Sequence, residues 1–432
     1  MAQAEPRSVV IIGGGIVGCT TAYYLTHHPS FISSRTQVTL LEASAHGAAQ
    51  GASGKAGGLV ARWAYPQPLV DVSFDEHVRL AELHGGPDRW GWRYVGCGSW
   101  EGRAEAVPET PPEENGADGE ADSLSGRRKS LEKTLGLEGG KPPKKKTKKA
   151  TGLPSDLTWM AEDLTDAYSP MAPHGDTAQV HPYFFTTSML AFAQEKGAEF
   201  TQGKATRIVI EDGGVTGVEY CDPSTQSEQH LLPATHVILA TGAWASTLLP
   251  ALPVTGTRAH SITIRPPKHH LPLAPYVLFT EITLPRDVGR GTRRRGTTHA
   301  SPEIYARPGP DGEVYACGPG DDAPLPPCVD DVVVDQEACD NVWRQVRGVS
   351  RVLRAGRVHR RQACYLPTVL GSRAGPIVGD ARQVARGLVV AVGHTCWGIS
   401  NAPGTARAIS ELVMEGEIRC ADLRSLQPSL FF

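Results

Sequence analysis

Three glycines near the start of the chain have the spacing of a loop that binds a dinucleotide. Gly13, Gly15 and Gly18 form a GxGxxG frame between the β-branched run VVII and a segment with helical periodicity. In such a strand, turn and helix, the first glycine permits the turn, the second lets a pyrophosphate approach the backbone, and the third lets helix and strand pack closely. Because the phosphates lie at the helix N-terminus, we expect Ile16 and Val17 to belong to the same site.

An acidic residue follows where a dinucleotide-binding fold needs one. The second predicted strand, QVTLLEA, contains Glu42 and Ala43, and Glu42 comes 24 residues after Gly18. A carboxylate at that place accepts hydrogen bonds from ribose hydroxyls. The order of strand, glycines, helix and acid therefore favours nucleotide binding over a glycine turn that binds nothing.

Length and composition narrow the class of protein. A chain of 432 residues exceeds what one hydrophobic core usually serves, so we expect two domains. The net charge of −3 provides no global basic field and implies no nucleic-acid partner. Nine cysteines without C-x-x-C pairs, in a chain that shows no signal peptide, predict reduced thiols and a cytoplasmic protein. We expect no transmembrane segment, because no apolar run reaches about 18 residues, and no metal site, because ligand spacing is missing.

The composition changes sharply between residues 101 and 152, which hold almost no large apolar side chains. The first half is acidic and the second ends in KPPKKKTKKA at 141–150. Such a segment cannot bury enough surface to order itself, so we expect a disordered charged insertion. A solvated charge run is the favoured interpretation of the lysines. A nuclear address, or attachment to an anionic membrane such as the endosomal surface, is the alternative, and a protein partner for this segment is left open.

The remaining segments alternate between strand and helix patterns. In the first helix Val17, Thr21, Tyr24 and Leu25 recur at helical spacing, which predicts one buried face. We expect further helices over about 70–85, from Pro182 to Gly197, over 336–353 and from Asn401 or Pro403 to Gly416, and strands around Gly213-Gly214, at VILATGAW and through 254–318.

Five stretches, taken in order, resemble the D-amino-acid oxidase superfamily of FAD-dependent oxidoreductases, which includes glycine and sarcosine oxidases. They are IIGGGIVG, GASGKAGGL, QVHPYFFTTSMLAFAQEKGAEF with TRIVI behind it, VILATGAW, and AVGHTCWGISNAPGTARAISELV. Within the superfamily they look most like a subgroup described only as FAD-dependent oxidoreductases. The resemblance implies FAD as the cofactor.

The resemblance also implies an α/β (α+β) fold with two domains. A Rossmann-like FAD-binding domain would be assembled from residues 1–75, 175–255 and 355–432. A substrate domain with a mixed, largely antiparallel sheet would comprise 76–100, 153–174 and 256–354, with the charged insertion at 101–152 outside both.

Residues that match the family's motifs are expected to contact FAD. The glycine loop would contact the pyrophosphate, and Glu42 the adenosine ribose. The backbone of Ile208 would meet the adenine. The other expected contacts are Ser53, Gly54 and Lys55 in GASGK, Thr241 and Gly242 in ATGAW, and Gly393, His394, Gly398 and Asn401 in the last motif.

The last motif offers a physical reason for flavin binding. A helix that begins at Asn401 or Pro403 would direct its positive end at the flavin edge that gains negative charge on reduction. An ordinary capped helix is the alternative. Cys364 falls near the position where some relatives attach flavin through a thioether, although a buried free cysteine is favoured here.

The resemblance implies oxidation of the C–N bond of an amino acid or secondary amine, by hydride transfer to flavin N5. Oxygen or another acceptor would then take the electrons. Arg62, in ARWAY, is similar to the arginine that helps bind the substrate carboxylate in monomeric sarcosine oxidases. Ser400 stands where those oxidases have a lysine, so recognition of a simple amino-acid carboxylate is left open. Besides Arg62, the candidates for substrate contact or catalysis are Trp397 and His260, followed by Arg258, Arg307 and Tyr305.

Two other functions are weighed against amine oxidation. The hypothesis of an NAD(P)-dependent Rossmann dehydrogenase accounts for the glycine loop. It does not account for VILATGAW or for the last motif. A non-catalytic interaction or trafficking protein, stabilised by flavin, would use the charged insertion to bind partners.

Overall fold

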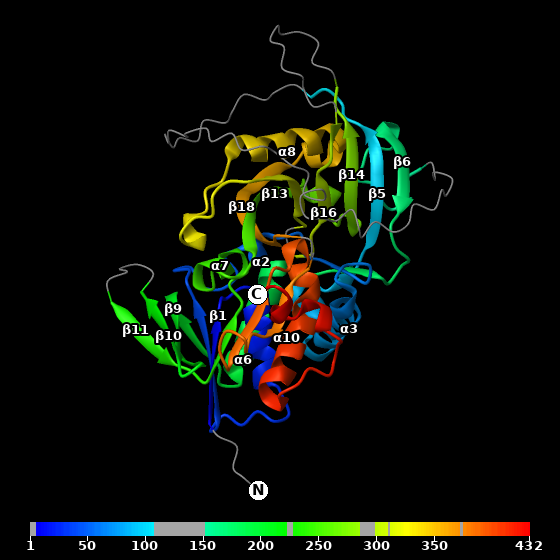
Figure 1. The fold of residues 1–432 in the computed structure, drawn as a ribbon. Coiled ribbons are helices and arrows are strands. Elements are labelled where there is room, and N and C mark those ends of the chain that lie inside the picture. Colours follow the sequence, from blue (N-terminus) through cyan, green and yellow to red (C-terminus); the bar gives the residue numbers. More distant parts are fainter. Residues whose placement is uncertain (1–5, 108–151, 223–227, 286–298, 310–311, 372–374) are drawn as a thin grey trace.

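The computed structural model describes residues 6–107, 152–222, 228–285, 299–309, 312–371 and 375–432. These residues form two lobes, with the chain crossing between them several times (Figure 1). The lower lobe in that view contains the N-terminal strand, and the upper lobe contains the larger sheet.

The lower lobe is built on a six-stranded sheet in the order β19-β20-β12-β1-β2-β8. Its neighbouring strands run parallel, except that β19 pairs antiparallel with β20. Side chains alternate across the first strand, so that Val9 and Ile11 enter one apolar core while Val10 and Ile12 enter another on the opposite face. The strands are β1 (Arg7–Ile12), β2 (Thr36–Glu42), β8 (Glu199–Gln202), β12 (His236–Leu239), β19 (Ile377–Asp380) and β20 (Leu388–Val392).

Helices cover the face of this sheet that carries Val9 and Ile11. All residues of the first helix are buried, because it lies between the sheet and two other helices. The prediction of a single buried face on this helix is therefore wrong. Two of its threonine hydroxyls bond within the helix: Thr21 Oγ1 donates to the Val17 carbonyl at 2.7 Å, and Thr26 Oγ1 donates to the Ala22 carbonyl at 2.9 Å. The helices are α1 (Ile16–Thr26), α3 (Gln67–His84), α4 (Gly86–Trp90), α6 (Pro182–Glu195) and α10 (Gly398–Glu415).

A smaller antiparallel sheet packs on the other face, in the order β11-β10-β9. The chain turns at Asp212 and Gly213 between β9 and β10, as the glycine pair in the sequence predicted. The elements here are β9 (Lys204–Glu211), β10 (Gly214–Cys221), β11 (Gln229–Pro233) and α7 (Ala245–Leu248).

The upper lobe contains a mixed sheet in the order β18-β13-β17-β16-β14-β5-β6, with β15 paired to β14. Its strands pair antiparallel except β14 with β5. Together with the parallel sheet below, this confirms the predicted α/β (α+β) class. The strands are β5 (Gly96–Arg103), β6 (Thr165–Pro170), β13 (Val254–Arg265), β14 (Tyr276–Thr283), β15 (His299–Ala300), β16 (Glu303–Ala306), β17 (Val314–Asp321) and β18 (Arg357–Val369).

One predicted helix of the upper lobe is divided. The pattern over 336–353 is interrupted at Ser350, which has extended backbone and accepts a hydrogen bond from the Leu353 N–H. Its hydroxyl thus caps a second short helix. The two helices are α8 (Gln336–Val349) and α9 (Arg351–Arg354).

Short elements connect the lobes and complete the chain. A three-stranded sheet consists of β3 (Leu59–Ala61), β7 (Thr177–Gln179) and β4 (Arg93–Tyr94), with α2 (Ala52–Lys55) before it. The 3₁₀ helices are η2 (Glu162–Leu164), η3 (Gly242–Trp244), η4 (Lys268–His270), η5 (Val329–Asp331), η6 (Thr395–Trp397), η7 (Arg424–Leu426) and η8 (Pro428–Leu430).

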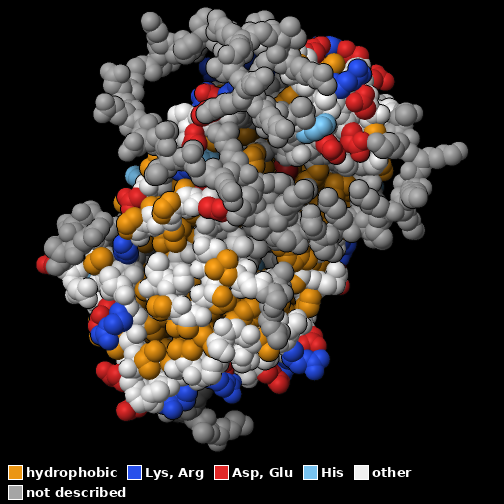
Figure 2. All heavy atoms as spheres, turned by 45° about the horizontal axis from the view of Figure 1, so that its top comes forward, with side chains coloured by type: hydrophobic (Ala, Val, Ile, Leu, Met, Phe, Trp, Pro, Cys, Tyr) orange, Lys and Arg blue, Asp and Glu red, His pale blue; other side chains and the backbone are white. Residues whose placement is uncertain are grey.

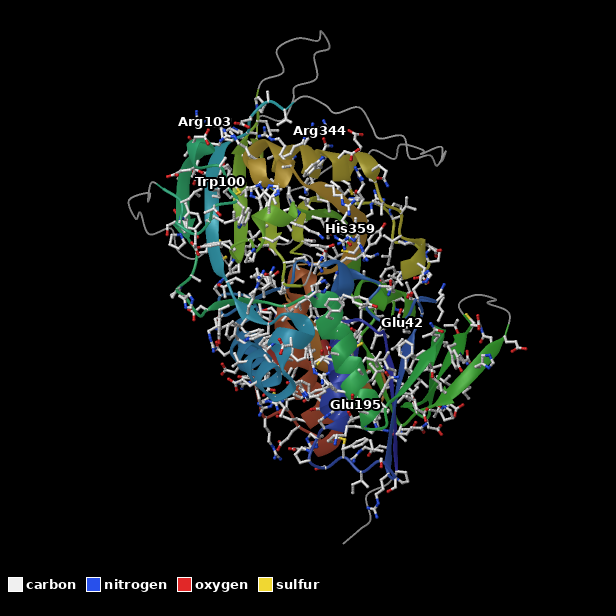
Figure 3. All side chains as sticks on the ribbon, turned by 180° about the vertical axis from the view of Figure 1, so that it is seen from behind. Glu42, Trp100, Arg103, Glu195, Arg344 and His359 are labelled. Atoms are coloured by element: carbon white, nitrogen blue, oxygen red, sulfur yellow. The ribbon has the colours of Figure 1, made fainter. Side chains whose placement is uncertain are left out.

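The first residues of the predicted charged insertion belong to the folded upper lobe. Trp100 and Arg103 lie in the outer sheet of the upper lobe (Figure 3), because β5 continues to Arg103. Beyond it, Ala104 N donates to the Thr283 carbonyl, and Glu105 binds Arg351 and Arg354. The expectation of disorder from residue 101 is thus wrong for 101–107. The rest of that expectation, including the lysine run, concerns residues 108–151, which lie outside the described residues.

Two segments lie in a different lobe from the one expected. Residues 76–90 fall in the segment expected for the substrate domain, yet Leu80 and Trp90 pack into the core of the lower lobe. Residues 357–369 fall in a segment expected for the FAD-binding domain, yet β18 pairs with β13 along its length in the upper sheet. Amphipathic spacing shows that a face is buried but not against which partner.

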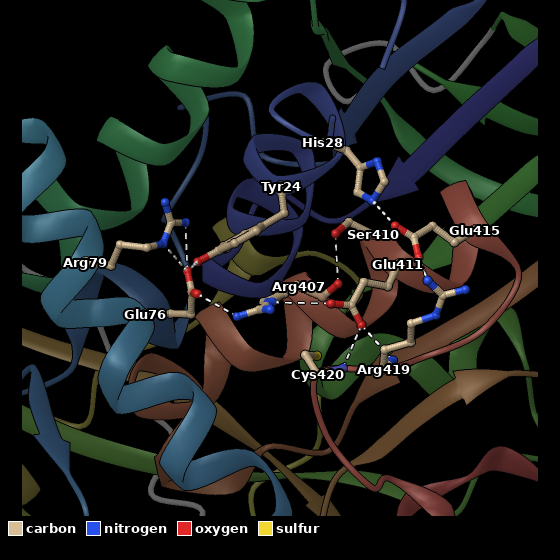
Figure 4. Close-up of polar contacts among 10 residues, drawn as sticks. All are labelled: Tyr24, His28, Glu76, Arg79, Arg407, Ser410, Glu411, Glu415, Arg419 and Cys420. Carbon is tan, nitrogen blue, oxygen red and sulfur yellow. Dashed lines mark hydrogen bonds and ion pairs between the residues drawn. The ribbon is translucent and has the colours of Figure 1, made fainter. Parts of the chain in front are cut away.

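A cluster of charged residues joins three helices of the lower lobe (Figure 4). Glu76 on α3 is buried and accepts hydrogen bonds from Tyr24 on α1, from Arg79 Nε at 2.8 Å and from Arg407 Nη1 on α10 at 3.0 Å. Glu411 accepts from Arg407 Nε at 3.3 Å and from the backbone N–H of Arg419, just beyond α10. The cluster therefore fixes the mutual positions of α1, α3 and α10.

The surface seen in Figure 2 mixes acidic and basic side chains along its edges. In the part of the chain that the structure describes, no helix combines the length and apolar character that crossing a bilayer requires.

Candidate active site

A cavity between the lobes lies at the carboxyl ends of β1, β2, β12 and β20. Ligands of open α/β sheets bind at these ends. Its lower wall is the glycine loop, and its upper wall comes from the β17 to α8 connection and from β18. The lining includes Gly13–Val17, Leu41–Ala43, Gln50–Ser53, Gly203–Ala205, Ala240–Trp244, Pro327–Val329, Tyr365–Pro367, Ala391–Cys396, Gly398 and Ile399.

The glycine loop has the shape that its spacing predicted. Gly13 has φ +112°, and a Cβ there would lie 2.5 Å from the Ala240 carbonyl oxygen. A Cβ on Gly18 would lie 1.9 Å from the Gly13 carbonyl oxygen. Gly18 thus permits close packing of α1 against β1, and it lies behind the cavity lining.

Glu42 holds the glycine loop from the end of β2 (Figure 3). Its carboxylate accepts hydrogen bonds from Gly14 N at 2.5 Å and from Ser44 N at 2.8 Å. Burial raises the pKa of this carboxyl, whereas the two backbone donors lower it. Because Glu42 also lines the cavity, it is placed to meet a polar group of a bound nucleotide.

The short helix α2 closes one side of the loop. Ser53 Oγ accepts a hydrogen bond from Ile16 N at 2.8 Å, so Ser53 caps α1 in place of Gly15, which has no side chain. Lys55 points elsewhere, because its Nζ donates to the Ala363 carbonyl on β18 at 3.1 Å, and burial lowers its pKa. Gly54 also lies outside the lining.

These residues fit the polar groups of a dinucleotide. The first turn of α1 directs backbone N–H groups toward the cavity, where phosphate oxygens would accept them. Thr241 lines the opposite wall, and its buried Oγ1 has no hydrogen-bond partner among the described residues. At Gly242, with φ +56°, a Cβ would meet no atom within 4 Å. The loop at Thr241 and Gly242 thus leaves space in the cavity and places an unpaired hydroxyl opposite the N-terminus of α1. A bound ligand would fill this space and bond to this hydroxyl.

The far end of the cavity is formed by Gly393 to Cys396, Gly398 and Ile399. His394 lines it, is buried, and bonds through Nε2 to Thr405 Oγ1 at 3.0 Å. Burial lowers the pKa of His394 to about 4, so its ring is neutral at physiological pH. His394 therefore forms part of the cavity wall, and Nε2 of its ring is already bonded to Thr405.

The predicted start of α10 is wrong by about one turn. The helix begins at Gly398, and Pro403 lies inside it. Proline cannot donate to the Ile399 carbonyl, and His77 on α3 supplies the missing donor through Nε2 at 2.9 Å. Ser73 on α3 also bonds to this turn, accepting from Gly404 N at 3.1 Å. Pro403 within the helical pattern therefore indicates that a neighbouring side chain must donate to the carbonyl four residues earlier.

A variant of His77 tests this arrangement. Burial lowers the pKa of His77 to about 4, from 6.5 in an unfolded chain. The unfolded chain therefore binds a proton between pH 6.5 and 4 that the folded protein does not, so stability is lost as the pH falls through this window. The free energy of unfolding is measured with urea at pH 7.5 and at pH 5.0. Between these two values it should fall by about 2 kcal/mol less in His77→Gln than in the unmodified protein, because glutamine has no group that binds this proton. Glutamine still offers a donor for the Ile399 carbonyl.

Substitution of an exposed histidine is the control for that measurement. His230 lies on the surface of β11, so His230→Gln makes the same substitution at a histidine that is not buried. An unchanged pH dependence in His77→Gln would contradict the assignment of a buried neutral imidazole.

The three candidates for catalysis lie in separate surroundings. Arg62 pairs with Asp75 at 2.6 Å, and its guanidinium lies 4.2 Å from the centre of the Phe74 ring. His260, on β13 in the upper lobe, accepts a hydrogen bond from Asp335 N at 3.0 Å. Only Trp397 adjoins the cavity, between its lining residues Cys396 and Gly398.

Other predicted residues are also held away from the lining. Ile208 belongs to the core beneath the sheet, and Asn401 Nδ2 donates to the Tyr65 carbonyl at 2.8 Å. Arg258 forms an ion pair with Asp321 at 3.0 Å. Cys364 is buried beside the lining residue Tyr365, and burial raises the pKa of its thiol to about 11. A protonated thiol is a poor nucleophile, which speaks against a covalent flavin.

Sequence reasoning missed several parts of the wall. Gln50 to Ala52 precede a predicted residue directly and could have been included. Gly203 to Ala205 follow the edge strand β8, and Pro327 to Val329 come from the other lobe, so no local pattern links them to the glycine loop.

Comparison with known proteins gives a consistent result. A family model described as FAD dependent oxidoreductase (DAO) matches residues 8–412. The chain is 30% identical to "Putative oxidoreductase TDA3" of Saccharomyces cerevisiae, over 99% of this chain and 95% of that protein. It is 31% identical to "Putative oxidoreductase C1F5.03c" of Schizosaccharomyces pombe, over 99% of both chains. A glycine oxidase structure from Geobacillus kaustophilus superposes with a TM-score of 0.67, at 18% identity over 98% of both chains.

Proposed function

The chain belongs to the DAO family of FAD-dependent oxidoreductases, and from that membership we propose that it oxidises the C–N bond of an amino acid or a secondary amine. The observation that carries the proposal is the cavity that joins the glycine loop, Glu42 and the first turn of α10. Glycine oxidase and other amino-acid oxidases share this fold, which supports the choice of substrate class.

We propose that the cavity lining holds FAD. Gly13 to Val17 and Thr241 would bind its phosphates, and Glu42 its ribose. When bound, FAD supplies an acceptor for the hydride that leaves the carbon beside the nitrogen. The first turn of α10 borders the far end of the cavity with its positive end, which favours a cofactor that gains negative charge.

A row of aromatic side chains near this turn would exclude water from the substrate. Trp397 and Trp63 lie 5.5 Å apart between ring centres, Trp63 and Phe279 6.0 Å, and Phe279 and Tyr305 6.3 Å. The row runs from the lower lobe to the upper sheet. Burial raises the pKa of Tyr305 well above its usual value, so the phenol stays protonated and is no general base. Apolar surroundings of this kind favour an uncharged amine.

Two arginines are candidates for a substrate carboxylate. Arg62 would have to leave Asp75 to bind one. Arg307, by contrast, is buried, and its Nε has no acceptor among the described residues. Its guanidinium lies 5.9 Å from the centre of the Tyr315 ring. Arg307 forms no ion pair among the described residues, and an unpaired cation is costly to bury. Arg307 is therefore a better candidate than Arg62 to bind a carboxylate.

Anaerobic reduction of the bound flavin tests the proposed reaction. The purified protein is mixed without oxygen with amino acids, with secondary amines and with amines that lack a carboxylate. We expect the flavin absorbance near 450 nm to bleach with at least one member of the first two groups and to return when an electron acceptor is added. Flavin that dithionite bleaches but no amine does would contradict the proposal and favour the non-catalytic alternative.

A further inference from the structure

A segment of the upper lobe crosses the cofactor cavity and attaches to the lower lobe. Residues 324–331, here called the strap, belong to the connection between β17 and α8 and include η5. Pro327, Cys328 and Val329 of the strap line the cavity. The strap thus covers the part of the cavity that contains Glu42 and Ala43.

The strap is fastened to the lower lobe by one carboxylate. Asp330 Oδ1 accepts a hydrogen bond from Ser44 Oγ at 2.6 Å, and Oδ2 accepts one from Ala45 N at 2.8 Å. Ser44 is fully buried and lies two residues after Glu42. In addition, Cys328 Sγ lies 3.7 Å from the Ala43 carbonyl oxygen. Hydrogen bonds to an ionised acceptor are the strong ones, and Asp330 forms two of them.

Two aromatic residues that line the cavity fix the other end of the strap. Tyr365 donates through its hydroxyl to the Pro324 carbonyl at 2.6 Å, and Trp244 donates through Nε1 to the Pro326 carbonyl at 2.8 Å. Within the described residues, no strap residue belongs to an apolar core cluster. A segment held by a few polar bonds opens more easily than the elements that carry the core.

We propose that Asp330 is a positioning residue for the cofactor site, which keeps the strap closed over the cavity and thereby slows the release of FAD. The cofactor would enter and leave by opening of the strap. Asp330 would act through the position of Pro327 to Val329 and touch no reacting atom. The proposal rests on FAD dependence and is independent of the substrate.

FAD release from the full-length holoprotein tests this role. The bound flavin is diluted into an excess of a competing apoflavoprotein, and its loss is followed by fluorescence. We expect Asp330→Ala to release FAD about tenfold faster, because both hydrogen bonds are lost, and Asp330→Asn to fall between this variant and the unmodified protein. Asp331→Ala is the matched control, because Asp331 is exposed like Asp330 but its side chain forms no hydrogen bond or ion pair among the described residues.

A second comparison separates strap opening from general instability. Ser44→Ala removes one partner of Asp330, so combining it with Asp330→Ala should accelerate release by less than the product of the two single effects. The thermal midpoint of the FAD-free protein should be the same in Asp330→Ala and Asp331→Ala. The proposal is overturned if Asp330→Ala releases FAD at the rate of Asp331→Ala, or if the two single effects multiply.

Discussion

A Gly15→Val variant is expected to fold and to purify without bound flavin, with its affinity for FAD lowered at least about 100-fold. Gly15 precedes α1 with φ −77° and ψ −178°, extended backbone that any residue adopts. A Cβ at this position would lie 3.1 Å from Ser53 Oγ on the cavity wall. The added methyl groups would therefore occupy space at the start of α1 and displace Ser53 from the Ile16 N–H.

The measurement is the ratio of flavin to protein after purification, followed by titration of the apoprotein with FAD. Thermal unfolding of the apoprotein shows whether the variant is folded. Gly51→Ala is the matched control, because Gly51 also lines the cavity but its added Cβ would make only an ordinary contact, 3.7 Å from Val329 Cγ2. This control should keep its flavin. A Gly15→Val protein with the full amount of FAD would mean that the cofactor binds elsewhere.

Among Gly13, Gly15 and Gly18, Gly15 is the glycine at which an added Cβ meets a side chain and not the backbone of the protein. A Cβ on Gly13 or Gly18 would collide with a carbonyl oxygen of the protein itself, at 2.5 Å and 1.9 Å. Loss of flavin in those variants would not separate a damaged fold from a blocked site. Gly15 differs because its neighbour is a side-chain hydroxyl at the edge of the cavity.

Local patterns predicted the parts of the site that lie close together in the sequence. The glycine loop and Glu42 at the end of its strand lie within one supersecondary unit. A turn and a strand end each require a particular spacing of residues, which can be recognised in the sequence. The resemblance to a family extended this to Ser53, Thr241, Gly242, Gly393, His394 and Gly398, which also line the cavity. Their contacts with FAD stay a prediction.

Parts of the site that depend on contacts between distant segments could not be predicted. The strap comes from the other lobe, and no spacing in its sequence relates Asp330 to Ser44. Similarly, a helix start was expected at Asn401 or Pro403 because proline is common there, whereas His77 allows the helix to begin at Gly398. A matching motif gives the place of a residue in the chain but not the direction of its side chain, as Lys55 shows.

Glu76→Ala should be the most destabilising of the variants considered, lowering the free energy of unfolding by about 2–4 kcal/mol. One buried carboxylate serves donors on three helices, namely Tyr24, Arg79 and Arg407 (Figure 4). Its removal leaves the buried Tyr24 hydroxyl without an acceptor. The arginine side chains are nearly half exposed and can turn toward water, which limits the loss.

The same variant should disturb the cavity through α3. That helix carries Glu76 between Ser73 and the donor His77, both of which hold the first turn of α10. Urea unfolding gives the loss of stability, and FAD titration of the folded fraction shows whether weaker binding accompanies it. Glu417→Ala is the control, since its ion pair with Arg419 is exposed to solvent and contributes little to stability. If Glu76→Ala unfolded like this control, the charged cluster would be dispensable, and the position of α10 would depend on its apolar contacts with α1 and α3 alone.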